Sequence, residues 1–328
     1  REIADRRAGE AGRFEGVAEF RREGAGLVYR EDGAWHHNAM GPPGPLDSYP
    51  LPARHLADGY RQAYHRVGLG QILSAVSSRG CTRRCTFCSV WRFHQGKYRK
   101  RSPELIVQEL ASRPERSIDF VDDDSFSDLR HMARLQEHVA EGLSDRSFKM
   151  YVRADAVVKD PDLFERWAGA GLRFVLVGFE AFRDHELDDL NKRTSAQQNI
   201  EALKILKRIG IGVIGYVIIR PDYSKDDFKW LADKIEELGI DQPVFGTLTP
   251  FPGTTLFEEV EDQLTSRNWD DYDGFHAVLP TKLPAREYYH QLAGLYRRAY
   301  GKMPVKPGTT PWFETVARAV EDLEPSPG

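Results

Sequence analysis

The chain has 328 residues, and its 46 lysine and arginine residues against 50 aspartate and glutamate residues give a net charge of −4. This balance excludes the strongly basic composition of a general nucleic-acid-binding protein. A hydrophobic content of 41% supports a folded chain, and the length suggests about two domains of ~150 residues. Because no apolar run approaches the ~20 residues of a membrane-spanning helix and no leader sequence is recognisable, we expect a cytoplasmic protein without a membrane span.

Residues 1–60 differ in composition from the rest of the chain. A charged start predicts a helix that is already under way, so we expect a further amino-terminal portion in the full-length protein. Asp32-Gly33 then lies between two short β-prone runs, which is typical of a two-residue hairpin. The prolines and glycines of residues 41–52 predict an extended linker to a second unit that begins near Leu56.

Beyond this linker, apolar β-branched runs alternate with amphipathic segments. Six runs predict strands: Ile72–Ser77, Ile118–Val121, Phe148–Val152, Phe174–Phe179, Gly212–Ile219 and Val244–Leu248. Six segments with apolar residues three, four and seven apart predict helices: Pro103–Ser112, Leu129–Leu143, Pro161–Ala170, Ala196–Ile209, Lys225–Leu238 and Thr255–Leu264. Strand followed by helix, six times over, implies parallel strands with right-handed crossovers. We therefore predict an α/β fold, a partial (β/α)6 TIM-like barrel whose functional loops follow the strands.

The pattern weakens after residue 265, where one further helix is predicted over Glu287–Tyr300. We therefore divide the chain into three parts. Residues 1–60 form a first unit and linker, residues 61–265 form the barrel, and residues 266–328 form a carboxyl-terminal helical extension.

All three cysteines, Cys81, Cys85 and Cys88, lie within eight positions in a C-x3-C-x2-C motif. An odd number of cysteines so closely spaced is a poor disulfide framework and a good metal-ligand cluster. Because the motif follows the first predicted barrel strand, we expect it at the mouth of the barrel. Three thiolates can hold three irons of a [4Fe-4S] cluster and leave the fourth iron open to a small chelating molecule.

Two other interpretations of these cysteines remain open. One is a zinc site in which His94 supplies the fourth ligand. The other is a set of small apolar core residues, which the arginines and threonines between the cysteines disfavour.

With the aromatic Phe87 directly before the last cysteine, the motif resembles the signature of the radical S-adenosylmethionine (SAM) enzymes. In that superfamily the open iron chelates the amino and carboxylate groups of SAM. An electron from the cluster cleaves the C5′–S bond, and the resulting 5′-deoxyadenosyl radical abstracts hydrogen from the substrate. The resemblance implies that Cys81, Cys85 and Cys88 are the metal ligands and that Phe87 helps to seat SAM.

Polar residues end the predicted strands where the resemblance implies contacts with SAM. Asp123 and Asp124 follow the second strand, and either carboxylate would suit the methionine ammonium group. Capping of the following helix by Asp122, Asp123 and Asp124 is the alternative role for these aspartates. Arg153 ends the third strand and Glu180 ends the apolar fourth strand, so both are also expected to help seat SAM. A purely structural Arg153–Glu180 ion pair is the alternative here.

A basic segment surrounds the cysteines: residues 79–101 contain eight lysines and arginines and no acid, with Trp91, Phe93 and Tyr98 between them. Basic residues interleaved with aromatic ones can bind RNA. A loop that covers an anionic cluster and cofactor needs the same charge, and the chain as a whole lacks a wide basic footprint. We therefore do not expect a nucleic-acid partner.

The resemblance extends over about residues 65–300 and is closest to the cobalamin-binding subgroup. Leu190-Asn191-Lys192-Arg193-Thr194-Ser195 and the stretch from Trp269 to Pro280 resemble methylases of unactivated carbon, including hopanoid methylases. Residues 1–52 look like the tail of a preceding α/β cobalamin-type domain and its linker, so the fold would include a remnant of that domain.

These similarities imply a radical SAM methyltransferase with a [4Fe-4S] cluster, SAM and, in the full-length protein, cobalamin. They also imply a small-molecule or lipid-like substrate and an external electron donor such as flavodoxin or ferredoxin. The alternatives are a radical SAM oxidoreductase or cyclase, an RNA-modifying radical SAM enzyme, and a zinc-dependent interaction module.

Overall fold

The computed structural model describes residues 21–66, 70–302 and 310–323. The chain divides into two compact units, Arg1–Gly44 and Pro45–Gly328. The second unit begins at Pro45, before the expected Leu56, and its first residues already bond to it, as Ser102 donates to Asp47 at 2.9 Å and Arg101 donates to the carbonyl of Leu46. Most of the helix expected at the start of the chain lies outside the described residues, and the assignment of residues 1–60 to a cobalamin-type domain stays a prediction.

The first unit contains the predicted hairpin. Strand β1 (Val28–Glu31) pairs antiparallel with β2 (Ala34–His37). Asp32 has φ 51° and Gly33 has φ 82° between them. Two consecutive positive φ angles define the turn type that matches the twist of a hairpin, so the turn prediction is confirmed.

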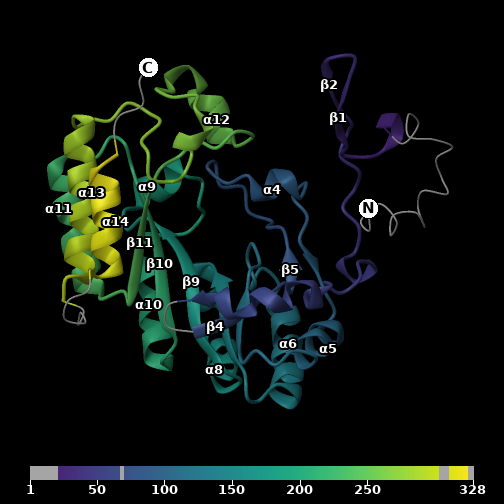
Figure 1. Ribbon diagram of the computed structural model, residues 1–328. Helices are drawn as coiled ribbons and strands as arrows, with labels where there is room; N and C mark the ends of the chain where they lie inside the picture. Colours follow the sequence, from purple (N-terminus) through teal and green to yellow (C-terminus); the bar gives the residue numbers. More distant parts are fainter. Residues whose placement is uncertain (1–20, 67–69, 303–309, 324–328) are drawn as a thin grey trace. The chain divides into compact units, whose positions relative to one another are not determined.

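The second unit is built on a sheet of seven strands in the order β11-β10-β9-β8-β7-β4-β3 (Figure 1). Six of them pair in parallel and follow one another along the chain: β4 (Gly70–Ala75), β7 (Ser117–Phe120), β8 (Ser147–Val152), β9 (Leu172–Glu180), β10 (Gly212–Ile219) and β11 (Gln242–Thr247). The short strand β3 (His65–Arg66) joins the edge antiparallel to β4. The sheet is curled into a half-barrel, so the predicted α/β class and partial barrel are confirmed.

Helices cover the sheet at the predicted places. They are α5 (Pro103–Ala111), α6 (Leu129–Gly142), α8 (Pro161–Gly169), α10 (Ala196–Ile209), α11 (Lys225–Leu238), α12 (Thr255–Val260) and α13 (Ala285–Tyr300). The sequence patterns did not predict α4 (Val90–Phe93), α7 (Ala154–Lys159), α9 (Asp184–Asp189) and α14 (Trp312–Glu321). The first three are too short to display a helical period, and α14 lies in the proline- and glycine-rich tail.

Helix α13 protects the open edge of the sheet at β11. The hydroxyl of Tyr300 donates to the carbonyl of Pro243, and the hydroxyl of Tyr296 both donates to the carbonyl of Phe245 and accepts from its amide. These are the backbone groups that a further strand would have paired, and Pro243 carries no amide hydrogen to satisfy. The carboxyl-terminal extension therefore completes the sheet, and Figure 1 shows α11, α13 and α14 together at this edge.

A fully buried ion pair joins two neighbouring strands. Lys149 of β8 and Asp119 of β7 are both 0% exposed, and their Nζ and Oδ1 atoms lie 2.8 Å apart. The Lys149 ammonium also lies 3.9 Å from the ring centroid of Tyr151.

No helix among the residues that the structure describes is long and apolar enough to cross a membrane.

Replacing Lys149 with methionine would leave the Asp119 carboxylate buried without its ammonium partner. We expect the free energy of unfolding, measured by urea denaturation, to fall by about 3–5 kcal/mol. The double variant Lys149→Met/Asp119→Leu removes both charges and should recover most of this loss. A single variant as stable as the unmodified protein would contradict the burial of this pair.

Candidate active site

The cysteine loop is an excursion that starts directly beyond β4. Strands β5 (Ser78–Arg79) and β6 (Arg99–Lys100) pair antiparallel and close its base. Gly80, with φ 92°, opens the loop, and a Cβ atom at this position would collide with the carbonyl oxygen of Lys97. Only glycine fits this left-handed, crowded position. The loop is therefore anchored where the first parallel strand ends.

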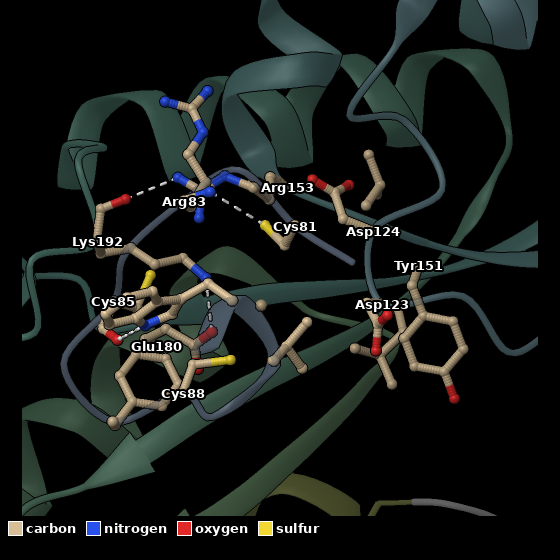
Figure 2. Close-up of a pocket in the computed structure, with 16 residues that line it drawn as sticks. Cys81, Arg83, Cys85, Cys88, Asp123, Asp124, Tyr151, Arg153, Glu180 and Lys192 are labelled. Atoms are coloured by element: carbon tan, nitrogen blue, oxygen red, sulfur yellow. Dashed lines mark hydrogen bonds and ion pairs between the residues drawn. The ribbon is translucent and has the colours of Figure 1, made fainter. Parts of the chain in front are cut away.

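The eight residues predicted as metal or SAM ligands line one pocket. Cys81, Cys85, Phe87, Cys88, Asp123, Asp124, Arg153 and Glu180 all contribute to its wall. Its empty volume, which includes space open to solvent, is about 690 Å³. In Figure 2, Cys85, Cys88, Glu180 and Lys192 lie on one side, and Asp123, Asp124 and Tyr151 on the other. The structure thus brings the predicted site residues together, whereas their roles stay predictions.

All three cysteines are free thiols, and Cys85 is buried at 5% exposure. Burial raises the pKa of the Cys81 thiol and raises that of Cys88 to about 11. These thiols are therefore protonated at neutral pH unless a metal ion stabilises the thiolates.

The cysteines fit a cluster better than a single zinc ion. Among the described residues, no group of three or more histidine, cysteine, aspartate or glutamate side chains could hold one metal ion. A zinc site needs such convergence on one point, whereas a cubane cluster binds each thiolate through a different iron. His94, the zinc ligand considered from the sequence, instead lies 3.3 Å from Asp123 and 3.2 Å from Arg99.

The three aspartates after β7 lie in different environments, and the first two, Asp122 and Asp123, bond to the cysteine loop. Asp122 accepts hydrogen bonds from Ser77 and Ser78 and so ties the base of the cysteine loop to β7. Asp123 accepts from the amide of Gly80 at 2.6 Å. Capping of α6 is performed by Asp128, which accepts from the His131 amide, so the capping role considered for these three aspartates is wrong.

Asp124 lines this pocket and has one buried side-chain oxygen without a hydrogen-bond partner among the described residues. Its side chain is 4% exposed, and Oδ2 accepts from the Ser127 hydroxyl at 2.6 Å. Oδ1 is buried and has no hydrogen-bond partner among the described residues. Burial raises the pKa of this carboxyl group. A buried acceptor without a partner is costly in a finished core and fits a site that receives a donor from a ligand.

The basic residues of the pocket are paired with acids other than those expected. Arg153 contacts Asp155 at 3.0 Å and donates to the carbonyl of Lys192 at 2.7 Å. The Lys192 ammonium lies 2.7 Å from Glu180, and both side chains are less than a tenth exposed. The structural Arg153–Glu180 pair considered from the sequence is therefore absent from the described residues. Arg83, also on the wall, pairs with Asp155 at 2.5 Å.

Glu180 has an unusual backbone for the last residue of a strand. Its φ is 62°, and Gly178 and Glu180 face consecutive residues of β10, which defines a bulge. The buried Asn199 amide donates to the carbonyls of Phe179 and Ala181 and so holds both sides of the bulge. Bulges beside sites re-aim side chains, and left-handed non-glycine residues collect at such positions.

Eight wall residues were not predicted as site residues, among them Arg83, Gly178 and Lys192. Lys192 belonged to a segment singled out by resemblance, although no role was assigned to it. Its place depends on the turn after α9, which returns the chain to the pocket. Gly178 is explained by crowding, because a Cβ atom there would lie 2.5 Å from Oε1 of Glu180.

Comparison with known proteins identifies the family. The sequence model of the radical SAM superfamily matches residues 75–235, which include the three cysteines and four of the six parallel strands. The chain therefore belongs to the radical SAM superfamily, whose members use a [4Fe-4S] cluster and SAM.

Two relatives are methylating enzymes. The chain is 33% identical over 267 residues to the hopanoid C-3 methylase of Methylococcus capsulatus, covering 80% of this chain and 51% of the relative. It is 29% identical over 269 residues to the bacteriochlorophyllide d C-12(1)-methyltransferase of Chlorobaculum tepidum, covering 76% of this chain and 57% of the relative. The chain thus spans about half the length of these relatives.

A solved structure shares the fold. The cobalamin-dependent SAM radical enzyme OxsB, with aqua-cobalamin and SAM bound, superposes with a TM-score of 0.64 at 16% identity. The match covers 90% of this chain and 50% of OxsB. It supports the half-barrel architecture described above.

We expect anaerobically prepared protein to contain about four irons and four sulfides per chain, since three thiolates without a fourth cysteine suit such a cubane. Cys85→Ala should lose most of the iron, measured by metal and sulfide analysis. Ser89→Ala, an exposed neighbour of Cys88, is the matched control and should retain it. One zinc per chain without sulfide would contradict the cluster.

Proposed function

We propose that the protein is a radical SAM methyltransferase and that the full-length protein also binds cobalamin. The proposal rests on one pocket, whose wall contains three cysteines together with acidic and basic residues from the ends of neighbouring strands. When bound, the [4Fe-4S] cluster supplies the electron that cleaves the C5′–S bond of SAM. The residues of this chain hold SAM in place and shield it from water.

The charges of the pocket complement the amino-acid part of SAM. The free Oδ1 of Asp124 would accept a hydrogen bond from the ammonium group of SAM. Lys192 and Arg153, on the wall beside Glu180, would face its carboxylate. Glu180 holds the Lys192 ammonium and so orients it.

An apolar cluster would receive the rest of the cofactor. Phe87 packs against three residues of this cluster, Leu190, Ile218 and Leu248. Ile218 lies on β10. Apolar side chains here would exclude water from the adenine ring, and Val152 and Leu176 extend the apolar wall toward the cysteines.

Methylation is the reaction that the relatives favour, because both enzymes compared above transfer methyl groups to carbon skeletons. On this proposal, residues 1–60 are the tail of a cobalamin-type domain and its linker, and cobalamin, when bound by the full-length protein, would supply the methyl-transfer chemistry. The substrate is a small or lipid-like molecule, and an external donor such as flavodoxin or ferredoxin supplies electrons.

The reaction type is tested by an anaerobic assay of the full-length protein with SAM, cobalamin, a reductant and cell extract. We expect 5′-deoxyadenosine, S-adenosylhomocysteine and a new methylated product, detected by mass spectrometry. An oxidised or cyclised product without S-adenosylhomocysteine would favour an oxidoreductase or cyclase. Methylated RNA would place the protein among RNA-modifying enzymes.

Lys192→Met removes the cation assigned to the SAM carboxylate. Because a hydrogen bond between charged groups contributes about 1.5–3 kcal/mol, we expect SAM affinity to fall at least about tenfold. Equilibrium dialysis with the cluster-loaded protein measures this affinity. Lys204→Met, at an exposed site on α10, is the matched control and should bind SAM normally.

The variant Lys192→Met also leaves Glu180 unpaired, so its stability must be measured separately. The double variant Glu180→Gln/Lys192→Met removes both charges and should restore thermal stability without restoring SAM affinity. A double variant that binds SAM as tightly as the unmodified protein would contradict the assignment.

A further inference from the structure

Four consecutive residues, Leu190–Arg193, connect the cysteine loop to the ends of two strands; we call this segment the latch. On the cysteine side, the carbonyl of Leu190 accepts from the amide of Thr86 at 3.0 Å. The side-chain amide of Asn191 donates to the carbonyl of Arg84 at 2.7 Å. Arg84 and Thr86 flank Cys85, so the latch holds the backbone on both sides of this ligand.

On the strand side, the latch is bound through Lys192. Its carbonyl accepts from Arg153 at the end of β8, and its ammonium pairs with Glu180 at the end of β9, both at 2.7 Å. One residue thus joins the two strand ends, and its neighbour Asn191 joins the cysteine loop. The path from Glu180 to Cys85 contains only hydrogen-bonded contacts and the chain itself.

The latch has a strained backbone that keeps these contacts directed to opposite sides. Asn191 has φ 47° and Arg193 has φ 53°, both in the left-handed region. Asparagine tolerates this region better than most residues. The Asn191 Oδ1 atom accepts from Nε of Arg193 at 3.3 Å, and the amide nitrogen donates to Arg84.

Two contacts outside the latch complete the frame around Cys85. The indole of Trp91 donates to the Cys85 carbonyl at 3.2 Å, and the amide of Leu256 in α12 donates to the carbonyl of Thr86 at 2.9 Å. Neither of these bonds reaches Lys192 or Arg153. Arg83 of the cysteine loop shares Asp155 with Arg153, whereas the latch is the segment that joins the backbone on both sides of Cys85 to Lys192.

We propose that Asn191 is a positioning residue that couples the charged side of the SAM site to the position of Cys85. The inference rests on the proposed function, because it assigns Lys192 to SAM. When SAM binds Lys192, it restricts the motion of the latch. Because Asn191 is bonded to the Arg84 carbonyl, this restricts the Arg84–Thr86 backbone as well. Asn191 touches neither the cluster nor SAM, and it acts by fixing a ligand-bearing backbone.

The test is the variant Asn191→Gly, since glycine keeps the left-handed backbone and removes the side-chain bonds to Arg84 and Arg193. Arg193→Gly is the matched control, because it changes the other left-handed residue of the latch and removes the bond to Asn191 Oδ1 while keeping the bond from Asn191 to the Arg84 carbonyl. Asn191→Asp is a second variant of the same shape that places an acceptor against the Arg84 carbonyl.

The first readout is hydrogen exchange of the peptide 81–88 in cluster-loaded protein without SAM. We expect exchange to be about tenfold faster in Asn191→Gly and Asn191→Asp than in Arg193→Gly, as for the loss of one hydrogen bond. Because this readout uses no SAM, it tests the latch even if the proposed function fails. Equal exchange in all variants would overturn the proposal.

The second readout is the electron paramagnetic resonance spectrum of the reduced cluster with and without SAM. We expect the unmodified protein and Arg193→Gly to show one SAM-dependent spectral change, and Asn191→Gly to retain its iron but show a broadened change with about tenfold weaker SAM binding. Faster exchange with an unaltered SAM response would overturn the coupling. An unmodified protein without any SAM response would instead refute the proposed function.

Discussion

The parallel order of six strands is the constraint on which the site depends. Parallel strands end at the same edge of a sheet, so residues that follow different strands meet there although they are far apart in the chain. Cys81 follows β4, Asp124 follows β7, Arg153 follows β8 and Glu180 ends β9, and all four line one pocket. The tyrosines of α13 support this arrangement at the edge strand β11, because they hydrogen-bond to its free backbone groups and so prevent a further strand from pairing there.

The charged side chains of the pocket are partly buried, and they form ion pairs. Each cation on its wall already has a carboxylate partner, as Lys192 with Glu180 and Arg83 with Asp155 illustrate. The pocket therefore holds its charges in fixed directions before any ligand arrives, which lowers the cost of binding. One oxygen of Asp124 has no hydrogen-bond partner among the described residues, and the thiols are protonated. An ammonium group would donate to this oxygen, and a metal cluster would bind the thiols as thiolates.

Much of this arrangement could be predicted from the sequence. Strand and helix periods placed all six parallel strands, and alternation of elements placed the cysteine motif and Glu180 at the same edge. Pairing could not be predicted, since alternation does not reveal which acid a given cation contacts. An Arg153–Glu180 ion pair was one alternative considered from the sequence, but the turn after α9 brings Lys192 to Glu180 instead, and that turn depends on two left-handed residues with no sequence period. The edge role of Tyr296 was equally hidden, because its hydroxyl bonds to backbone groups 51 residues away.

The central claim is that three cysteines hold a four-iron cluster with one open iron that binds SAM. Mössbauer spectroscopy of the iron-57-enriched protein tests it most directly, since it distinguishes the iron sites of one cluster. The expected result is a [4Fe-4S] spectrum in which the parameters of one iron in four change when SAM is added. A spectrum unaffected by saturating SAM, or protein that binds zinc and no iron under anaerobic reconstitution, would contradict it.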